Sequence, residues 1–163
     1  MVDALARRHS FARARRAYSG RYAAGEIAGR AVGLLIPTTY MNESGRSVAA
    51  ALRDLHLSQA DLLVVHDHID LPFGRLRLTQ GGGHGGHNGI RSIFELVGRD
   101  FDHVRMGVGR PASTDPGVVA DYVLGRFSEP RTAVDDLVGR AADAVELWVA
   151  DGVEAAMNQV NVG

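Results

Sequence analysis

A short continuous apolar run near the middle of the chain limits the possible folds more than any other feature. Residues 61–66 (DLLVVH) lack the alternation of polar and apolar side chains that a half-exposed strand shows, which indicates a strand covered on both faces. Such a strand needs helices on each side of its sheet. The run therefore predicts an α/β protein of three layers, with a mixed, mostly parallel twisted sheet between helices.

The segments on either side alternate between strand-like and helix-like patterns. We expect strands at residues 21–27 and 31–36, which flank the turn Ala28-Gly29, and at 74–79 and 104–108. Apolar spacings of three and four predict helices at 2–16, 42–55, 90–96, 118–124 and 129–150. We find no internal repeat and no linker, so we expect one domain over residues 1–163.

Composition excludes several classes of protein. With 163 residues, 45% of them hydrophobic, the chain can bury a core without disulfides or a metal. The absence of cysteine excludes a disulfide scaffold, a cysteine zinc finger and a thiol nucleophile. No apolar run is long enough to span a membrane and no signal peptide is present, so we expect a soluble cytoplasmic monomer without a membrane partner.

Charge is distributed unevenly along the chain. Residues 1–111 hold 15 Arg and 10 acidic residues, whereas residues 112–163 hold 3 Arg and 9 acidic residues. The first part could therefore face a polyanion. The alternative is compositional, because every basic residue is Arg, as a GC-rich genome favours.

A glycine loop at residues 81–89 (GGGHGGHNG) satisfies the spacing GxGxxG. A dinucleotide site requires this loop directly after a first strand, but here the loop lies midway along the chain. We therefore expect no bound nucleotide cofactor. The glycines instead predict a backbone that a ligand can approach, and a helix start at Asn88-Gly89 that offers free N–H groups to an anion.

Four histidines and an aspartate lie close together in the sequence. His66, His68, His84 and His87 have spacings that a metal site could use. The alternative is that His84 and His87 make hydrogen bonds within the glycine loop. Asp67 follows the apolar run, at the end of a strand where open α/β sheets place their ligands. Its carboxylate is expected either to orient a histidine or to cap a loop.

Two asparagines stand at predicted helix starts. Asn42 and Asn88 are each followed within two residues by Ser or Gly, so each could be a helix N-cap. The alternative is that their amides face a ligand.

Three long motifs resemble those of the bacterial peptidyl-tRNA hydrolases. They are residues 37–45 (PTTYMNESG), 64–74 (VVHDHIDLPFG) and 81–89 (GGGHGGHNG). Residues 105–111, 122–125 and 156–158 continue the similarity, which covers essentially the whole chain. The motifs occur in the family's order and at its spacing.

The resemblance implies an enzyme that hydrolyses the ester between a peptide and the 3′ end of tRNA, without metal or cofactor. By position, Asn42 would hold the catalytic water or the peptide backbone, Asn88 would bind the end of peptidyl-tRNA, and Tyr40 would line the same cleft. Asp67 would be the catalytic carboxylate that orients a histidine acting as general base. Peptidyl-tRNA is then the expected partner.

Arg77 and Arg105 lie on the strands beside the glycine loop. We expect them to contact phosphates of the acceptor stem. The alternative is that both are solvated residues on a strand face.

One departure from the family concerns the catalytic histidine. In the family, a first strand leads to a Gly-Asn-Pro-Gly loop and then to a Thr-Arg-His-Asn segment, and neither occurs in these 163 residues. Residues 2–6 resemble the helix after that segment, so we expect the first strand to be missing, and His9 comes too late to replace the histidine.

Two explanations stay open: Met1 is an internal methionine of a longer gene, or the shorter protein is real and has lost hydrolysis. The second would leave a tRNA-binding relative without catalysis. A third interpretation is a metal hydrolase that uses the histidine cluster.

Overall fold

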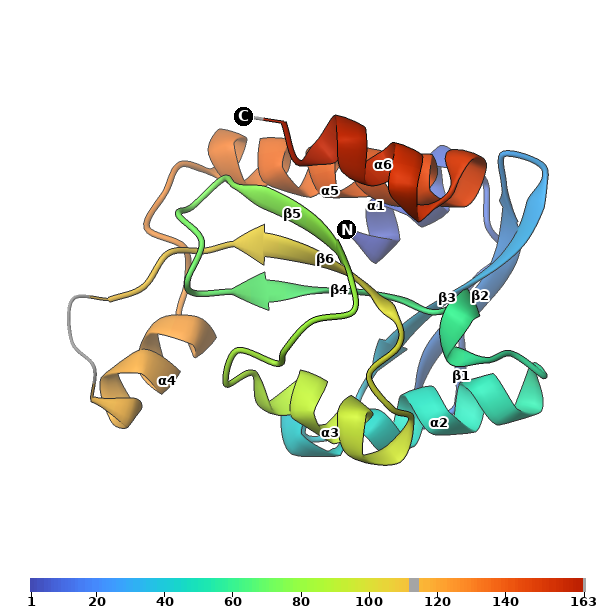
Figure 1. Ribbon diagram of the computed structural model, residues 1–163, viewed down its shortest axis with the longest axis horizontal. Helices are drawn as coiled ribbons and strands as arrows, with labels where there is room; N and C mark the ends of the chain where they lie inside the picture. Colours follow the sequence, from blue (N-terminus) through green and yellow to red (C-terminus); the bar gives the residue numbers. More distant parts are fainter. Residues whose placement is uncertain (112–114, 163) are drawn as a thin grey trace.

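The computed structural model describes residues 1–111 and 115–162 and arranges them as helices around two small sheets (Figure 1). The strands are β1 (Arg15–Ala17), β2 (Gly20–Ile27), β3 (Arg30–Pro37), β4 (Leu63–His68), β5 (Leu76–Gln80) and β6 (Asp102–Gly107). The α-helices are α1 (Val2–Arg8), α2 (Ser44–Asp54), α3 (Asn88–Leu96), α4 (Pro116–Leu124), α5 (Arg131–Asp151) and α6 (Val153–Val160). Two 3-10 turns, η1 (Met41–Glu43) and η2 (Gln59–Asp61), precede α2 and β4.

The first sheet is antiparallel, in the order β1-β2-β3. Ala28 and Gly29 form the two-residue turn between β2 and β3, with φ angles of 53° and 74°. A two-residue hairpin turn whose twist matches the strands needs positive φ at both positions. The hairpin predicted around Ala28-Gly29 is therefore confirmed.

The second sheet has the order β4-β6-β5, with β4 parallel and β5 antiparallel to β6. A mixed sheet is thus confirmed, but the expectation of a mostly parallel one is wrong. Three of the four strand pairs in the described residues are antiparallel. The reason is connectivity: the short connections β1–β2, β2–β3 and β4–β5 each reverse the direction of the chain. Because β6 lies between β4 and β5 and runs parallel to β4, after the long connection that contains α3, it is antiparallel to β5.

Helices cover both faces of the second sheet, as the apolar run predicts. Val64 packs with α2 and α3 in a cluster built on Val48, Ile90, Ile93 and Phe101. Its neighbour Val65 packs on the opposite face, against residues of α5. Figure 1 shows α5 and α6 along one side of the sheet and α2 and α3 along the other. This arrangement fixes the carboxyl end of β4 between two layers.

Several element boundaries differ from the sequence prediction; the largest difference is in the first helix, and one in β4 affects the candidate site. The first helix ends at Arg8 instead of residue 16, because only Leu5 is buried on it and the chain turns at Ser10, where φ is 53°. Strand β4 continues through His68. His66 and Asp67 therefore lie within the strand, held by its pairing with β6.

Candidate functional site

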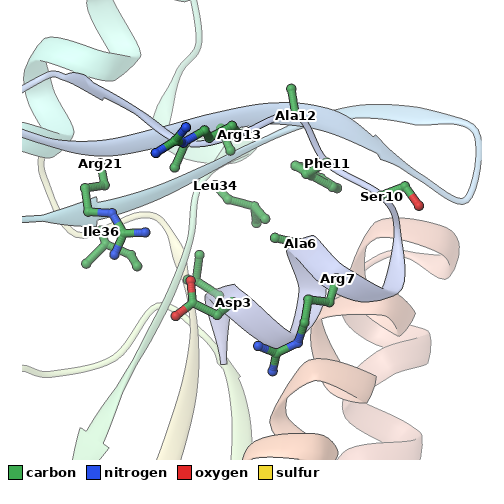
Figure 2. Close-up of a pocket in the computed structure, with 13 residues that line it drawn as sticks. Asp3, Ala6, Arg7, Ser10, Phe11, Ala12, Arg13, Arg21, Leu34 and Ile36 are labelled. Carbon is green, nitrogen blue, oxygen red and sulfur yellow. The ribbon is translucent and has the colours of Figure 1, made fainter.

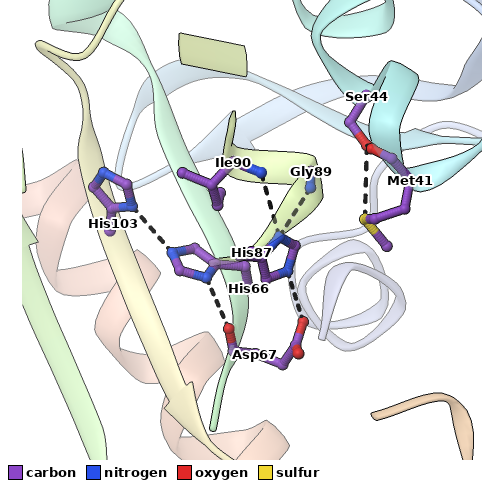
Figure 3. Close-up of polar contacts among 8 residues, drawn as sticks. All are labelled: Met41, Ser44, His66, Asp67, His87, Gly89, Ile90 and His103. Atoms are coloured by element: carbon purple, nitrogen blue, oxygen red, sulfur yellow. Dashed lines mark hydrogen bonds and ion pairs between the residues drawn. The ribbon is translucent and has the colours of Figure 1, made fainter. Parts of the chain in front are cut away.

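The carboxyl end of β4 meets the glycine loop and the start of α3, and these elements bring together the polar residues that the sequence singled out. Figure 3 shows His66 and Asp67 of β4 facing His87 at the start of α3 and His103 of β6. Hydrogen bonds connect these four residues in series, and the one between His66 and Asp67 goes to the backbone oxygen of Asp67. This cluster is the candidate site.

Asp67 and His87 form the exposed end of the series. The Nε2–H of His87 donates to Oδ1 of Asp67 at 2.8 Å. On its other side, Nδ1 of His87 accepts from the backbone N–H groups of Gly89 at 3.1 Å and Ile90 at 3.3 Å. An imidazole nitrogen that accepts carries no proton, so this bonding fixes the neutral Nε2–H tautomer of His87.

The ionisation of Asp67 reflects two opposed effects. Partial burial raises its pKa, but the hydrogen bond from His87 and the electrostatic interaction with that side chain outweigh burial and hold the pKa below its usual value. The side chain of Asp67 keeps about a third of its surface exposed. The site therefore presents a carboxylate at neutral pH. If Asp67 orients a histidine that lies outside these residues, its carboxylate is expected to have no partner here. This expectation of an unpartnered carboxylate is wrong, because His87 bonds to Oδ1.

Below Asp67, two buried histidines bond to each other. Nε2 of His66 lies 3.0 Å from Nδ1 of His103, and Nδ1 of His66 lies 2.9 Å from the backbone oxygen of Asp67. Burial lowers the pKa of His66 to about 3 and that of His103 to about 4, so both are neutral at pH 7. Sequence reasoning missed His103, because nothing in its strand marks it as different from a core residue.

The histidine cluster does not converge on a metal position in the described part of the chain. His66 and His87 are engaged as above, and Nδ1 of His84 accepts from the backbone N–H of Gly86 at 2.9 Å. Burial lowers the pKa of His68. His9, which the sequence places too late to replace the catalytic histidine, lies away from this cluster. Its Nε2 is 3.5 Å from the carboxylate of Glu146 on α5.

The turn η1 packs on α3 and so brings the predicted substrate residues to the same region. Close packing of α2 on α3 holds this turn in place: Gly45 N–H donates to Oγ of Ser92 at 2.9 Å, and a Cβ at Gly45 would lie 2.2 Å from the Ser92 carbonyl oxygen. Tyr40, at the entrance to η1, is 82% exposed. Exposed side chains on both elements can therefore meet one ligand.

The N-cap alternative for the asparagines is not observed. The side chain that caps α3 is His87, and Asn88 is the first residue of the helix. Asn42 lies inside η1, and Glu43 precedes α2 without a side-chain cap. Both asparagine side chains are exposed, and neither makes a hydrogen bond within residues 1–111 and 115–162. Their amides are available to a ligand.

Arg105 holds the glycine loop through hydrogen bonds from its guanidinium group. Its guanidinium donates to the backbone oxygen of Gly83 at 3.0 Å and to Oγ1 of Thr79 at 3.3 Å, and the residue is buried. Arg77, its cross-strand neighbour on β5, is exposed. A phosphate contact stays a prediction for both, with Arg77 the more accessible.

A cavity of about 350 Å³ lies apart from this cluster, between α1 and the β2–β3 pair (Figure 2). Its floor is apolar and includes Phe11, Leu34 and Ile36, while Arg7 and Arg21 lie at its edge. The cavity contains none of the residues predicted to bind substrate.

The fold and the cluster define an α/β protein with a carboxylate site at the carboxyl end of a parallel strand. The chain belongs to the peptidyl-tRNA hydrolase family, whose model matches residues 1–163. The resemblance of the three motifs is thereby confirmed, and the protein is a hydrolase of this family. No helix among the described residues is long and apolar enough to cross a membrane.

Individual relatives agree with this assignment. A peptidyl-tRNA hydrolase of Sorangium cellulosum is 48% identical over 162 residues, which are 98% of this chain and 73% of that protein. One from Geobacter sp. strain M21 is 41% identical and covers 99% of this chain and 85% of its own length. The crystal structure of peptidyl-tRNA hydrolase from Acinetobacter baumannii superimposes with a TM-score of 0.88 at 36% identity, over 99% of this chain and 82% of that one.

Proposed function

We propose that the protein hydrolyses the ester bond between peptide and tRNA in peptidyl-tRNA, with the reaction at the carboxyl end of β4. The observation that carries this proposal is the ionised Asp67 carboxylate, held by His87 beside the exposed start of α3. We further propose that it acts as a single domain and a monomer in the cytoplasm, where translation supplies the substrate. The reaction needs no metal or cofactor in this proposal.

The exposed amides bind the reacting end of the substrate. Asn42 in η1 holds the attacking water or the peptide backbone, and Asn88 binds the peptidyl-tRNA end, with Tyr40 along the same surface. The packing of η1 on α3 supports a shared ligand for these three residues. Amide N–H groups here can stabilise the negative charge that develops on the carbonyl oxygen of the ester.

The base is a histidine oriented by Asp67. Each carboxylate oxygen can accept hydrogen bonds, so Oδ2 of Asp67 can receive a second imidazole while His87 holds Oδ1. The family supplies this histidine from its Thr-Arg-His-Asn segment. A carboxylate fixes the tautomer of the base and stabilises the imidazolium as the base takes a proton from water.

One observation favours a second candidate, a tRNA-binding protein without hydrolysis. The two imidazoles that contact Asp67 have no ring nitrogen available as a base. Both nitrogens of His87 are bonded, and His66 is buried with a pKa of about 3. These 163 residues would then bind peptidyl-tRNA through Asn42, Asn88 and the arginines without hydrolysing it.

A two-by-two comparison separates the candidates. Hydrolysis of peptidyl-tRNA is measured for the 163-residue chain and for the chain fused to the family's strand and Arg-His-Asn segment, each with Asp67 and with Asp67→Asn. We expect the segment to raise hydrolysis by about 10²- to 10⁴-fold, the range of general base catalysis, and Asp67→Asn to remove much of that gain.

The remaining outcomes distinguish the alternatives. Rapid hydrolysis by the unfused chain would place the base within these residues. Absence of hydrolysis in all four proteins, with tRNA binding retained, would favour the second candidate. Equal activity of the fused protein with Asp67 and with Asn at that position would show that Asp67 does not orient the base.

A further inference from the structure

His66 and His103 form a buried pair that the proposed reaction does not use. His103 is fully buried and His66 is 8% exposed. They lie on neighbouring parallel strands, β4 and β6, where Val64 is the register partner of His103 and Arg105 that of His66. The pair is connected to the site because Nδ1 of His66 lies 2.9 Å from the backbone oxygen of Asp67.

The bonding partners determine the protonation of every nitrogen in the pair. A carbonyl oxygen can only accept, so Nδ1 of His66 carries the proton and donates to Asp67. In a neutral imidazole, Nε2 of His66 is then an acceptor. Nδ1–H of His103 must therefore donate to it across 3.0 Å, which leaves Nε2 of His103 without a proton.

The opposite direction of the central bond requires a charged His66. A His66 that donated from Nε2 would also have to keep the proton on Nδ1, and so would be an imidazolium. The titratable groups that face it are Asp67, His87, His103 and Arg105. Burial, together with the electrostatic effects of His87, His103 and Arg105, outweighs the hydrogen bond to the Asp67 carbonyl and lowers the pKa of His66 to about 3. The neutral arrangement is therefore the one present at pH 7.

Aromatic rings hold His103 in its orientation. Phe101 stacks on it with ring centres 4.7 Å apart, and Phe94 contacts it edge-on at 6.2 Å. Its Nε2 is buried without a hydrogen-bond partner among the described residues, which agrees with the assignment because an unprotonated nitrogen leaves no buried N–H unpaired. Rotating the ring would move Nδ1 of His103 away from Nε2 of His66 and break the hydrogen bond between them.

We propose that His103 and His66 are a positioning pair of fixed tautomers, which holds the Asp67 peptide at the strand end and so sets the direction of the Asp67 carboxylate. This inference rests on the proposed role of Asp67 in hydrolysis. Hydrogen bonds from His103 to His66 to the Asp67 backbone fix one side of the residue, and His87 fixes the carboxylate. A displacement of Asp67 by a fraction of an ångström would misalign the base it orients.

The first test is nuclear magnetic resonance of the chain with ¹⁵N-labelled histidine at pH 7, which reports tautomers without any need for activity. We expect the Nδ1–H form for His66 and the Nε2–H form for His87. In His103→Phe, which keeps a ring but removes the donor, the Nε2 signal of His66 should shift because this nitrogen loses its hydrogen bond, and the His87 Nε2 signal should shift as well. His103→Asn, whose amide can donate from the position of Nδ1, should restore both.

Two results would overturn the inference: an Nε2–H tautomer of His66 in the unaltered chain, or His87 signals that are the same in His103→Phe. The measurement on the unaltered chain remains decisive even if His103→Phe does not fold.

The second test is the pH profile of peptidyl-tRNA hydrolysis by the form that is active. His103→Phe should lower kcat by about 10- to 100-fold with KM little changed. It should also move the acid limb of the kcat profile to lower pH, because a misaligned Asp67 stabilises the imidazolium of the base less, and His103→Asn should reverse both effects. An unchanged profile in an active His103→Phe protein overturns the positioning role. If no form hydrolyses peptidyl-tRNA but the histidines show the expected tautomers and signal shifts, the proposed function is overturned. The inference that the pair controls the position of Asp67 is then still supported.

Discussion

His87 carries out two structural tasks with one side chain. It caps α3 through Nδ1 and holds Asp67 through Nε2–H, so neither nitrogen is available to accept a proton from water. Helix N-caps are usually Ser, Thr, Asp or Asn, and an imidazole in this position joins the helix start directly to the strand end. The start of α3 and Asp67 are therefore held at a fixed distance, which suits a site that binds a substrate across both elements.

The salt dependence of tRNA binding can test whether the two arginines beside the glycine loop contact phosphates. Each phosphate contact removed lowers the slope of log affinity against log salt by about 1. We expect this change in tRNA binding for Arg77→Ala, because Arg77 is exposed. Arg131→Ala is a control, since Arg131 lies on α5 with 92% of its side chain exposed and should leave the slope unchanged.

Arg105→Ala separates two roles. An affinity loss that persists at all salt concentrations would show that Arg105 acts by holding Gly83 and Thr79. A lower salt slope would show that its remaining N–H groups reach phosphate. Slopes that equal that of the unaltered chain in both arginine variants would place the tRNA on another surface.

At the scale of elements, the β2–β3 hairpin contains a residue in an unfavourable conformation. Ala28 has φ of 53°, a left-handed conformation that costs alanine about 1–2 kcal/mol and that asparagine tolerates better. We expect Ala28→Asn to raise the free energy of unfolding by about 0.5–1 kcal/mol, measured by urea denaturation.

Gly29→Ala is the matched control in the same turn. Gly29 has φ of 74°, and a Cβ there would meet no atom within 4 Å, so the substitution introduces backbone strain without a clash. It should lower the free energy of unfolding by about 1 kcal/mol. If Ala28→Asn were neutral and Gly29→Ala harmless, the turn would not be the one described.

For the whole molecule, the two buried histidines couple stability to pH. Their pKa values of about 3 and about 4 lie below the usual value of 6.5, so below pH 6.5 the unfolded chain binds protons that the folded chain does not. The free energy of unfolding should therefore decrease as pH falls from 6.5 towards 4, by on the order of 1 kcal/mol per pH unit for each histidine.

Urea denaturation at a series of pH values measures this decrease. His103→Phe removes one of the two groups, so its stability should depend less steeply on pH over the same range. Equal steepness in both proteins would mean that His103 is not held neutral by the fold.

The sequence by itself determined the features that depend on neighbours along the chain. The apolar run at β4 predicted helices on both faces of its sheet, Ala28-Gly29 predicted a hairpin, and the three motifs identified the family. Each of these follows from local periodicity, from turn conformation or from the residues themselves. The motifs also singled out Asp67, although not what it bonds.

Only the tertiary structure decided which side chains meet. His87 lies 20 residues from Asp67 and His103 lies 37 residues from His66, and both contacts depend on how α3 docks and how β4 pairs with β6. Strand direction likewise came from connectivity, so the strands that the structure describes are mostly antiparallel and not mostly parallel as the pattern predicted. A histidine in a sequence has two tautomers and no partner, and only the groups placed around it by the fold select its proton position.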